Sequence, residues 1–477
     1  MPIIDLIIKN GRIVTSFGVV EAGIGINKGK IVAVAKDVNL PRADKVIDVD
    51  HNFVLPGIID AHVHFREPGS DKRETFVTGT KAAASGGVTT VFEMPVSNPA
   101  VSSAEVLEKR KRIVNRGAIV DFALYGGAGM HNIDEIQKLA KAGVIGFKTF
   151  MHGPPKGRET EYKGTYVIND GYFFDVLQTV AGTRLPHSIH AENNAIINFL
   201  TEKLKKAGRK DALAHAESRP NFVEAEAVSK VIILAKIAGT HVHIAHLSTR
   251  EGVQIIKQAK NSGQLVTVET CPHYLLLTAE AMKKLGPYAK INPPLRSEKD
   301  VKDLWMGVNS GTIDIIVSDH APFMKEEKEA GWKDIWRAQS GSPTVENMLP
   351  LLLTKVNEGK ISLERLVQVT SEMVARIFGI YPKKGVIQVG SDADLVVIDL
   401  DKKMMIEKEK MFSNARDLTI YDGWEVRGYP IMTIVRGEIV MKEGKIFAKP
   451  GYGKFISPSS INKLKFGNNK LKFGNNK

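Results

Sequence analysis

Two histidines separated by a single residue, His62 and His64, end an apolar run in the segment FVLPGIIDAHVHF. Side chains two residues apart on a strand point to the same face, so both imidazoles face the same way at the end of a predicted strand. Imidazole is a frequent ligand of zinc and related metals. The spacing therefore predicts one edge of a metal site, although such a pair in isolation is more often structural or merely exposed.

Four further residues of types that occur in metal sites end later apolar runs. A lysine at a strand end or an Asp-His pair is commonplace when it occurs alone. Imidazoles, a carboxylate and a lysine that converge from five predicted strands are typical of a metal site in a hydrolase and not of a hydrophobic core. We therefore predict that six residues belong to one metal centre: His62, His64, Lys148, His190, His246 and Asp319.

The lysine, Lys148, distinguishes between kinds of metal chemistry. An ammonium group has no lone pair and cannot bind a metal. A neutral lysine shielded from water can take up carbon dioxide to form a carbamate, which carries a negative charge and two oxygens. Such a group can bridge two divalent ions roughly 3.5–4 Å apart, which lower the pKa of a shared water and polarise a carbonyl. We predict this carbamate and a two-metal centre; the alternative is a structural ion pair of Lys148 with a carboxylate.

The residues of this site lie on runs that alternate with amphipathic segments through the middle of the chain. Eight short apolar runs, from FVLPGIIDAHVHF to TIDIIVSDHAP, are separated by stretches with helical spacing such as 104–116, 133–142 and 222–238. This alternation predicts an α/β protein with a (β/α)8 TIM barrel, which we place at residues 55–384. In such barrels the active site lies at the carboxyl ends of the strands, where the predicted metal site also falls.

The two ends of the chain contain short alternating strands broken by glycines, such as DLIIKNGRIV near the start and TIVRGEIVMKEGKI near the end. We predict that residues 1–54 and 385–455 together form a small β-sandwich domain into which the barrel is inserted. The last residues repeat the heptad KLKFGNN. We predict that residues 456–477 are a disordered tail or foreign to the native chain.

The composition excludes several classes of partner. The net charge is +13, but the last fifteen residues supply five lysines and no acid. Elsewhere lysines are interleaved with glutamates, as in KEEK at 325–328, which is typical of a solvated surface and not of a nucleic-acid site. No run reaches the ~18 apolar residues of a membrane span, and the first ten residues read as a strand and not as a signal peptide. The single cysteine, Cys271, excludes an internal disulfide and favours a cytoplasmic location.

The segments around the predicted site resemble those of the cyclic amidohydrolases, the group of hydantoinases (dihydropyrimidinases), allantoinases and dihydroorotases. The resemblance extends from about Asp5 to about Phe455 and keeps the order of the family's motifs. The motifs that carry it are DAHVHFREPG, GGVTT, GFKTF, HAEN, HLST, ETCPHYL, NPPLR and SDHAP.

The resemblance implies roles for individual residues. Asp319 would be the general acid/base, and the backbone of Asn292 would hold the substrate ring. We expect two divalent ions, zinc with manganese or cobalt as alternatives, a small-molecule substrate, and a homotetramer or homodimer. One ion would be held by His62, His64, Lys148 and Asp319, and the other by Lys148, His190 and His246.

The substrate is predicted from four positions at which the relatives differ. Arg66 resembles the arginine that dihydroorotases use against the substrate carboxylate, but Val96 stands where those enzymes have an asparagine. Gly153 occupies the position of a tyrosine in dihydropyrimidinases and D-selective hydantoinases. Ser340 replaces an asparagine of many relatives near the last substrate loop. Arg66 alone favours dihydroorotate. On balance Val96, Gly153 and the segments after residue 330, which look most like L-selective hydantoinases and allantoinases, favour a five-membered cyclic ureide.

We therefore predict that the protein opens a hydantoin or allantoin ring to the carbamoyl acid, with Arg66, Asn292 and Ser340 as substrate-binding residues. The buried guanidinium that this implies needs an anion, and Glu67, Glu74 and Glu93 are candidate partners inside the protein. The alternatives are a dihydroorotase, a mononuclear deaminase and a non-catalytic relative that has lost metal ligands. Mononuclear deaminases lack a lysine at the position of Lys148.

Overall fold

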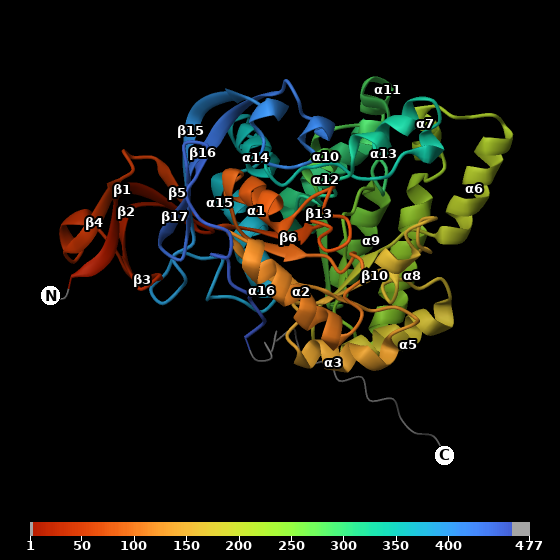
Figure 1. The fold of residues 1–477 in the computed structure, drawn as a ribbon, viewed down its shortest axis with the longest axis horizontal. Coiled ribbons are helices and arrows are strands. Elements are labelled where there is room, and N and C mark those ends of the chain that lie inside the picture. Colours follow the sequence, from red (N-terminus) through yellow and green to blue (C-terminus); the bar gives the residue numbers. More distant parts are fainter. Residues whose placement is uncertain (1–2, 460–477) are drawn as a thin grey trace, which may run out of the picture.

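The computed structural model describes residues 3–459, and its central feature is a barrel of parallel strands surrounded by helices (Figure 1). Neighbouring strands pair in the order β6-β7-β8 and β9-β10-β11-β12-β13-β14, and β8 continues into β9 after Tyr125. A parallel bridge between Val63 and His320 joins the two groups and closes the barrel. The strands are β6 (Ile58–Val63), β7 (Val88–Glu93), β8 (Asp121–Leu124), β9 (Gly126–Gly127), β10 (Phe147–Phe150), β11 (His187–His190), β12 (Val242–Ile244), β13 (Val266–Thr270) and β14 (Ile315–Ile316).

The helices between these strands begin where polar side chains cap them. Ser103 and Thr249, for example, accept hydrogen bonds from the backbone of the first turn of α2 and α9. The three helical segments predicted from the sequence are confirmed by α2, α3 with the short turn before it, and α8. The principal outer helices are α1 (Phe76–Ser85), α2 (Ala104–Gly117), α3 (Ile136–Lys141), α5 (Asp170–Ala181), α8 (Asn221–Ala238), α9 (Arg250–Asn261), α12 (Glu298–Ser310) and α14 (Met348–Asn357).

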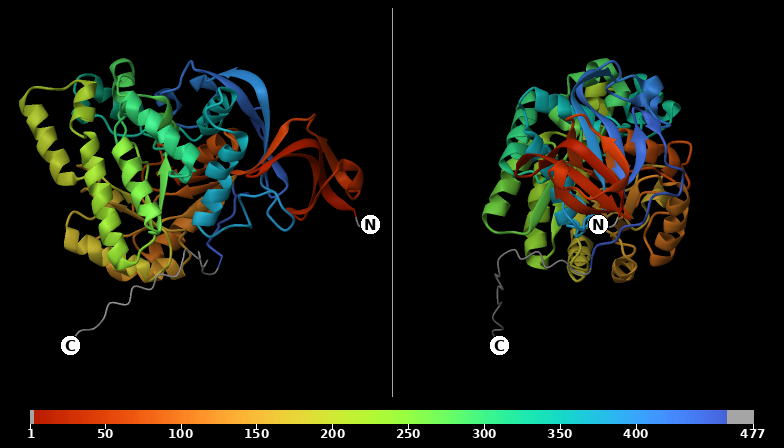
Figure 2. Two further views of the ribbon diagram at one scale, coloured as in Figure 1. Left: turned by 180° about the vertical axis from the view of Figure 1, so that it is seen from behind. Right: turned by 90° about the vertical axis from the view of Figure 1, so that its left-hand side faces the viewer.

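Strands from the two ends of the chain form a second, nine-stranded sheet beside the barrel (Figures 1 and 2). Ile8 and Ile24 from the first residues share one buried core with Val397 and Ile434 from the last. The strands join into one hydrogen-bonded sheet because β1 pairs with β2, β4 and β5, and β5 in turn pairs with β15 from the other end of the chain. They are β1 (Ile4–Thr15), β2 (Gly18–Asn27), β3 (Lys30–Ala35), β4 (Ala43–Asp48), β5 (Phe53–Pro56), β15 (Leu395–Met405), β16 (Glu425–Val435), β17 (Glu438–Lys442) and β18 (Lys445–Ile446).

The chain passes from this sheet into the barrel at Gly57. The predicted boundary between residues 54 and 55 cuts through β5, which pairs with β15 as far as Pro56. A Cβ atom at Gly57 would lie 2.2 Å from Oγ1 of Thr89. The apolar run FVLPGIIDAHVHF is therefore two strands of different sheets, and glycine permits the close approach that separates them.

Of the predicted tail, residues 460–477 lie outside the described residues. Residues 456–459 still contact the barrel: the backbone N–H of Ile456 donates to the carbonyl of Phe122 at 2.7 Å, and the Ile456 side chain is buried. Among the described residues, no helix is both long and apolar enough to cross a membrane.

A buried charge cluster joins the barrel to the terminal sheet. Lys384 Nζ lies 2.8 Å from Asp121 Oδ2 and 3.3 Å from Asp392 Oδ2, and it also pairs with Asp394. The three carboxylates could together hold a metal ion, but the lysine ammonium already contacts each of them. The cluster therefore contains its own cation.

We expect Lys384→Met to lower the free energy of unfolding by about 3–5 kcal/mol, because it removes the buried cation that the three carboxylates share and leaves Asp394 without an ion-pair partner among the described residues. Chemical denaturation measures this, with Lys383→Met as the control, since Lys383 is the exposed neighbour in the sequence. A loss below about 1 kcal/mol would show that the cluster contributes no more than an ordinary surface contact.

Candidate metal centre

A cavity of about 520 Å³ opens at the carboxyl ends of the barrel strands. It brings together all but one of the residues that the sequence predicted for the site. The exception is Lys148, which is fully buried beneath the cavity. The predicted residues that line it are His62, His64, Arg66, His190, His246, Asn292, Asp319 and Ser340.

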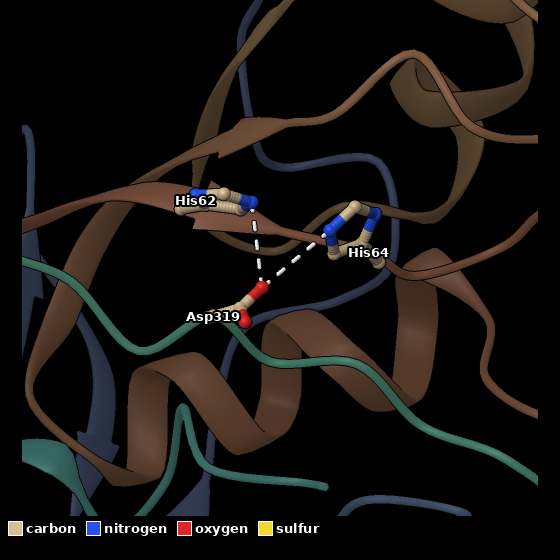
Figure 3. Close-up of side chains that lie close together, drawn as sticks. All are labelled: His62, His64 and Asp319. Atoms are coloured by element: carbon tan, nitrogen blue, oxygen red, sulfur yellow. Dashed lines mark ion pairs between the residues drawn. The ribbon is translucent and has the colours of Figure 1, made fainter. Parts of the chain in front are cut away.

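Three of these residues form a compact group (Figure 3). Asp319 Oδ1 lies 3.3 Å from His62 Nε2 and 3.6 Å from His64 Nε2, and ligand atoms of the three residues are close enough to hold one metal ion. Closure of the barrel places them together, because the bridge between Val63 and His320 sets the end of β6 beside the segment that follows β14.

Two further histidines form a second group next to the first. His190 Nδ1 and His246 Nε2 lie 3.0 Å apart, and the ring of His246 is 5.4 Å from that of His62. Burial keeps the pKa of both His190 and His246 well below the usual value for histidine. Burial therefore favours the neutral form of both imidazoles, which is the form that binds a metal.

Lys148 lies on β10 and has no exposed surface. Among residues 3–459, no group forms a hydrogen bond with its Nζ atom, and burial lowers the pKa of Lys148 to about 8. A buried ammonium group without an anionic partner is costly. The predicted alternative of a structural ion pair is therefore not formed, and the unpaired amine fits a group that is modified or bound to metal. Together with the neutral imidazoles and the Asp319 carboxylate, it makes a donor set that fits divalent metal ions.

A carboxylate that was not predicted, Glu269 on β13, orients these ligands. It accepts hydrogen bonds from His62 Nδ1, from His243 Nε2 at 3.0 Å and from the backbone N–H of His246 at 3.2 Å. Because His62 donates through Nδ1, its Nε2 keeps a lone pair on the side of Asp319. Glu269 ends an apolar run as the predicted ligands do, so the strand-end pattern could have identified it if glutamate had been included.

Arg66 does not form the internal ion pair that we considered from the sequence. Arg66 is 3% exposed, and its Nε and Nη1 atoms have no hydrogen-bond partner within the described part of the chain. Each candidate partner is engaged elsewhere: Glu67 accepts from the N–H of Phe76, Glu93 pairs with an arginine of α2, and Glu74 accepts from a serine hydroxyl. Burial lowers the pKa of Arg66 to about 10.

Three guanidinium groups surround one buried phenyl ring at the cavity wall. The Cζ atoms of Arg66, Arg73 and Arg158 lie 5.1, 5.0 and 5.3 Å from the centre of the Phe323 ring. Arg73 and Arg158 are neutralised by ion pairs, whereas Arg66 is not. The carboxylates that pair with Arg73 and Arg158 are Glu161 and Glu327. One positive charge at the cavity is therefore left without a counter-ion from the described residues.

Comparison with known proteins supports the interpretation of this cavity. A model described as "Amidohydrolase family" matches residues 53–440. The chain belongs to this amidohydrolase family. The L-hydantoinase of Paenarthrobacter aurescens is 39% identical to this amidohydrolase over 463 residues, or 97% of this chain and 100% of that protein. An allantoinase of Rubrobacter xylanophilus is 37% identical, over 96% and 98% of the two chains, and a dihydroorotase of Methanosarcina acetivorans is 36% identical, over 95% and 96%.

The fold of this amidohydrolase is also similar to solved structures. The structure of the L-hydantoinase (dihydropyrimidinase) from Arthrobacter aurescens matches it with a TM-score of 0.92 at 39% identity, covering 95% of this chain and 100% of that one. The resemblance to cyclic amidohydrolases and the predicted barrel with its terminal β domain are therefore confirmed.

Proposed function

We propose that this amidohydrolase opens a five-membered cyclic ureide, such as a 5-substituted hydantoin or allantoin, by adding water across a ring C–N bond. The observation that carries the proposal is the convergence of the two histidine groups on one cavity above an unpaired, buried Lys148. The similarity to an L-hydantoinase and an allantoinase supports the choice of ring.

In this proposal the residues of the cavity have two kinds of role, metal binding and proton transfer. His62, His64 and Asp319 would hold one divalent ion, His190 and His246 the other, and a carbamate on Lys148 would join them. When bound, the two ions lower the pKa of a water and polarise the ring carbonyl. Asp319 is the group that moves the proton: it accepts one as water attacks and returns it to the departing ring nitrogen. Zinc fits these ligands, as do manganese and cobalt.

Steady-state kinetics on hydantoin, 5-substituted hydantoins, allantoin, dihydrouracil and dihydroorotate test this function. We expect the highest kcat/KM for one of the five-membered rings and a ureido acid as the product. A protein with its full complement of metal that opens none of these rings would contradict the proposal.

A second candidate, the hydrolysis of dihydroorotate, is favoured by one observation. The guanidinium of Arg66 lines the cavity without a counter-ion from the described residues, and a planar carboxylate on the substrate could supply one. The similarity to a dihydroorotase is of the same order as that to the allantoinase. Val96, where dihydroorotases have an asparagine, argues against this candidate.

We expect Arg66→Met to change kcat/KM for hydantoin or allantoin by less than about tenfold, because a neutral ring has no carboxylate to pair with the guanidinium. For an acidic substrate the same variant should raise KM by about 10- to 150-fold, the equivalent of a hydrogen bond to a charged group. Arg337→Met is the control, since Arg337 is an exposed arginine at the rim of the same cavity. Efficient hydrolysis of dihydroorotate that is lost in Arg66→Met would favour the second candidate.

A further inference from the structure

A lysine without exposed surface holds the loop that forms one wall of the cavity. Lys328 lies on α13 (Lys325–Glu329) and is fully buried. Its ammonium group donates to the carbonyl of Lys290 at 3.0 Å, to that of Gln339 at 3.0 Å and to that of Gly341 at 2.8 Å. These acceptors belong to the two segments that carry Asn292 and Ser340. One ammonium group therefore connects the two substrate-facing segments.

A second buried lysine holds the same loop from another side. The Nζ atom of Lys290 donates to the carbonyl of Ile335 at 2.8 Å and to that of Ala338 at 2.6 Å. Within residues 3–459, neither Lys290 nor Lys328 forms an ion pair with a carboxylate. The carbonyl dipoles of the loop are thus the groups that stabilise both buried ammonium groups, so any movement of these carbonyls is costly.

These contacts determine the direction of the peptide groups on either side of Ser340. A trans peptide unit is planar, and its C=O and N–H point in opposite directions. Because the carbonyl of Gln339 points to Lys328, the N–H of Ser340 points away from it. The N–H of Gly341 donates to the carbonyl of Lys290 at 2.9 Å, so the carbonyl of Ser340 also points away from that side. Both peptide bonds are trans.

Because both groups point away from Lys328 and Lys290, the N–H and the carbonyl of Ser340 are free to bind a ligand. Neither forms a hydrogen bond with another described residue, and Ser340 lines the cavity. The loop is also fixed at the next residue: Gly341 has a φ of 148°, and a Cβ atom there would lie 2.5 Å from the carbonyl oxygen of Ala321. Glycine at this position therefore allows the loop to lie close against the segment that follows β14.

A cyclic amide presents the complementary pair of groups. In a small ring the amide is cis, so its C=O and N–H lie side by side on one edge. A residue whose backbone N–H and C=O point the same way can bind both groups of such an edge. We propose that Lys328 is a positioning residue, which fixes the loop so that Ser340 receives the cis-amide edge of the substrate. This inference rests on the proposed function of the cavity.

The first test compares Lys328→Met with Lys325→Met, an exposed lysine of the same helix. We expect amide hydrogen exchange of residues 335–341 to be at least about tenfold faster in Lys328→Met and unchanged in Lys325→Met. Each protein is measured with its metal bound and without substrate. Unchanged exchange in Lys328→Met would overturn the role of this lysine in holding the loop.

The second test measures recognition of the ring edge. For each protein, kcat and KM are determined for hydantoin and for its derivatives methylated at either ring nitrogen. We expect Lys328→Met to raise KM for hydantoin by about tenfold, the equivalent of one or two neutral hydrogen bonds, with a smaller change in kcat and unchanged metal content. The preference for hydantoin over a methylated derivative should shrink, which a loss of stability alone would not cause. A wild-type preference in folded, metal-bound Lys328→Met would overturn the proposal.

A third variant covers the case in which Lys328→Met does not fold. An ester in place of the amide between Gln339 and Ser340, with an alanine side chain at 340, removes the N–H and leaves Lys328 in place. The matched control is Ser340→Ala, which keeps that N–H. We expect KM for hydantoin to be about tenfold higher in the ester variant than in Ser340→Ala. Equal KM values in the two variants would overturn the proposal. If the wild-type protein opens no cyclic ureide, the proposed function fails and the assignment of the ring edge fails with it. Hydrogen exchange still decides separately whether Lys328 holds the loop.

Discussion

Lys148→Ala should lose both its bound metal and its activity. The side chain is fully buried, its Nζ atom has no partner among the described residues, and five other candidate ligands surround the same cavity. A carbamate on this amine would bridge two ions, so its removal takes away a ligand from each of them. The measurements are metal content after gel filtration and kcat/KM for the best cyclic ureide.

Two further experiments separate this bridging role from simple destabilisation. Lys141→Ala, at an exposed lysine on α3, should keep both metal and activity. A short carboxylic acid at high concentration should restore part of the activity of Lys148→Ala, because its two oxygens can replace those of the carbamate. A carbamate signal from labelled bicarbonate should appear in the wild-type protein and in Lys141→Ala, but not in Lys148→Ala. Fully metallated, active protein with an unmodified Lys148 would rule the bridge out.

Asp319→Asn should keep most of its metal and lose about 10²- to 10⁴-fold in kcat, the usual contribution of a general acid/base. The amide has nearly the shape of the carboxylate and an oxygen that can still act as a ligand, but it cannot accept and return a proton. His64→Ala is the informative comparison, because it removes a ligand of the same group and should lose metal together with activity. Turnover close to wild type in Asp319→Asn would show that another group moves the proton.

Much of the site could be predicted because its residues end strands of one barrel. His62 and His190 are in β6 and β11, and Lys148 is in β10, so hydrophobic runs and alternation place them correctly. His246 and Asp319 follow their strands and have positive φ values of 37° and 48°. Their position at the mouth could be predicted, but the direction of their side chains is set by loop conformations that alternation does not describe.

The same limit applies to Arg66. β6 ends at Val63 and Arg66 has a φ of 67°, so the alternation of a strand does not set the direction of its side chain. Its surroundings are formed by segments far apart in the sequence, including Arg158 and Phe323. Contacts of this kind depend on how loops from different strands pack, and no local pattern encodes them. The contacts of Lys328 with the loop at 339–341 could not be predicted from the sequence for the same reason.

The metal content of purified, active protein, titrated against turnover of a cyclic ureide, tests the proposed centre most directly. Two divalent ions per chain are expected, with activity lost on chelation and regained as the second ion binds. Full activity with one ion per chain would instead fit a mononuclear deaminase-like site, and a chain that binds no metal would fit a non-catalytic relative. Either result would contradict a two-metal hydrolase built on Lys148.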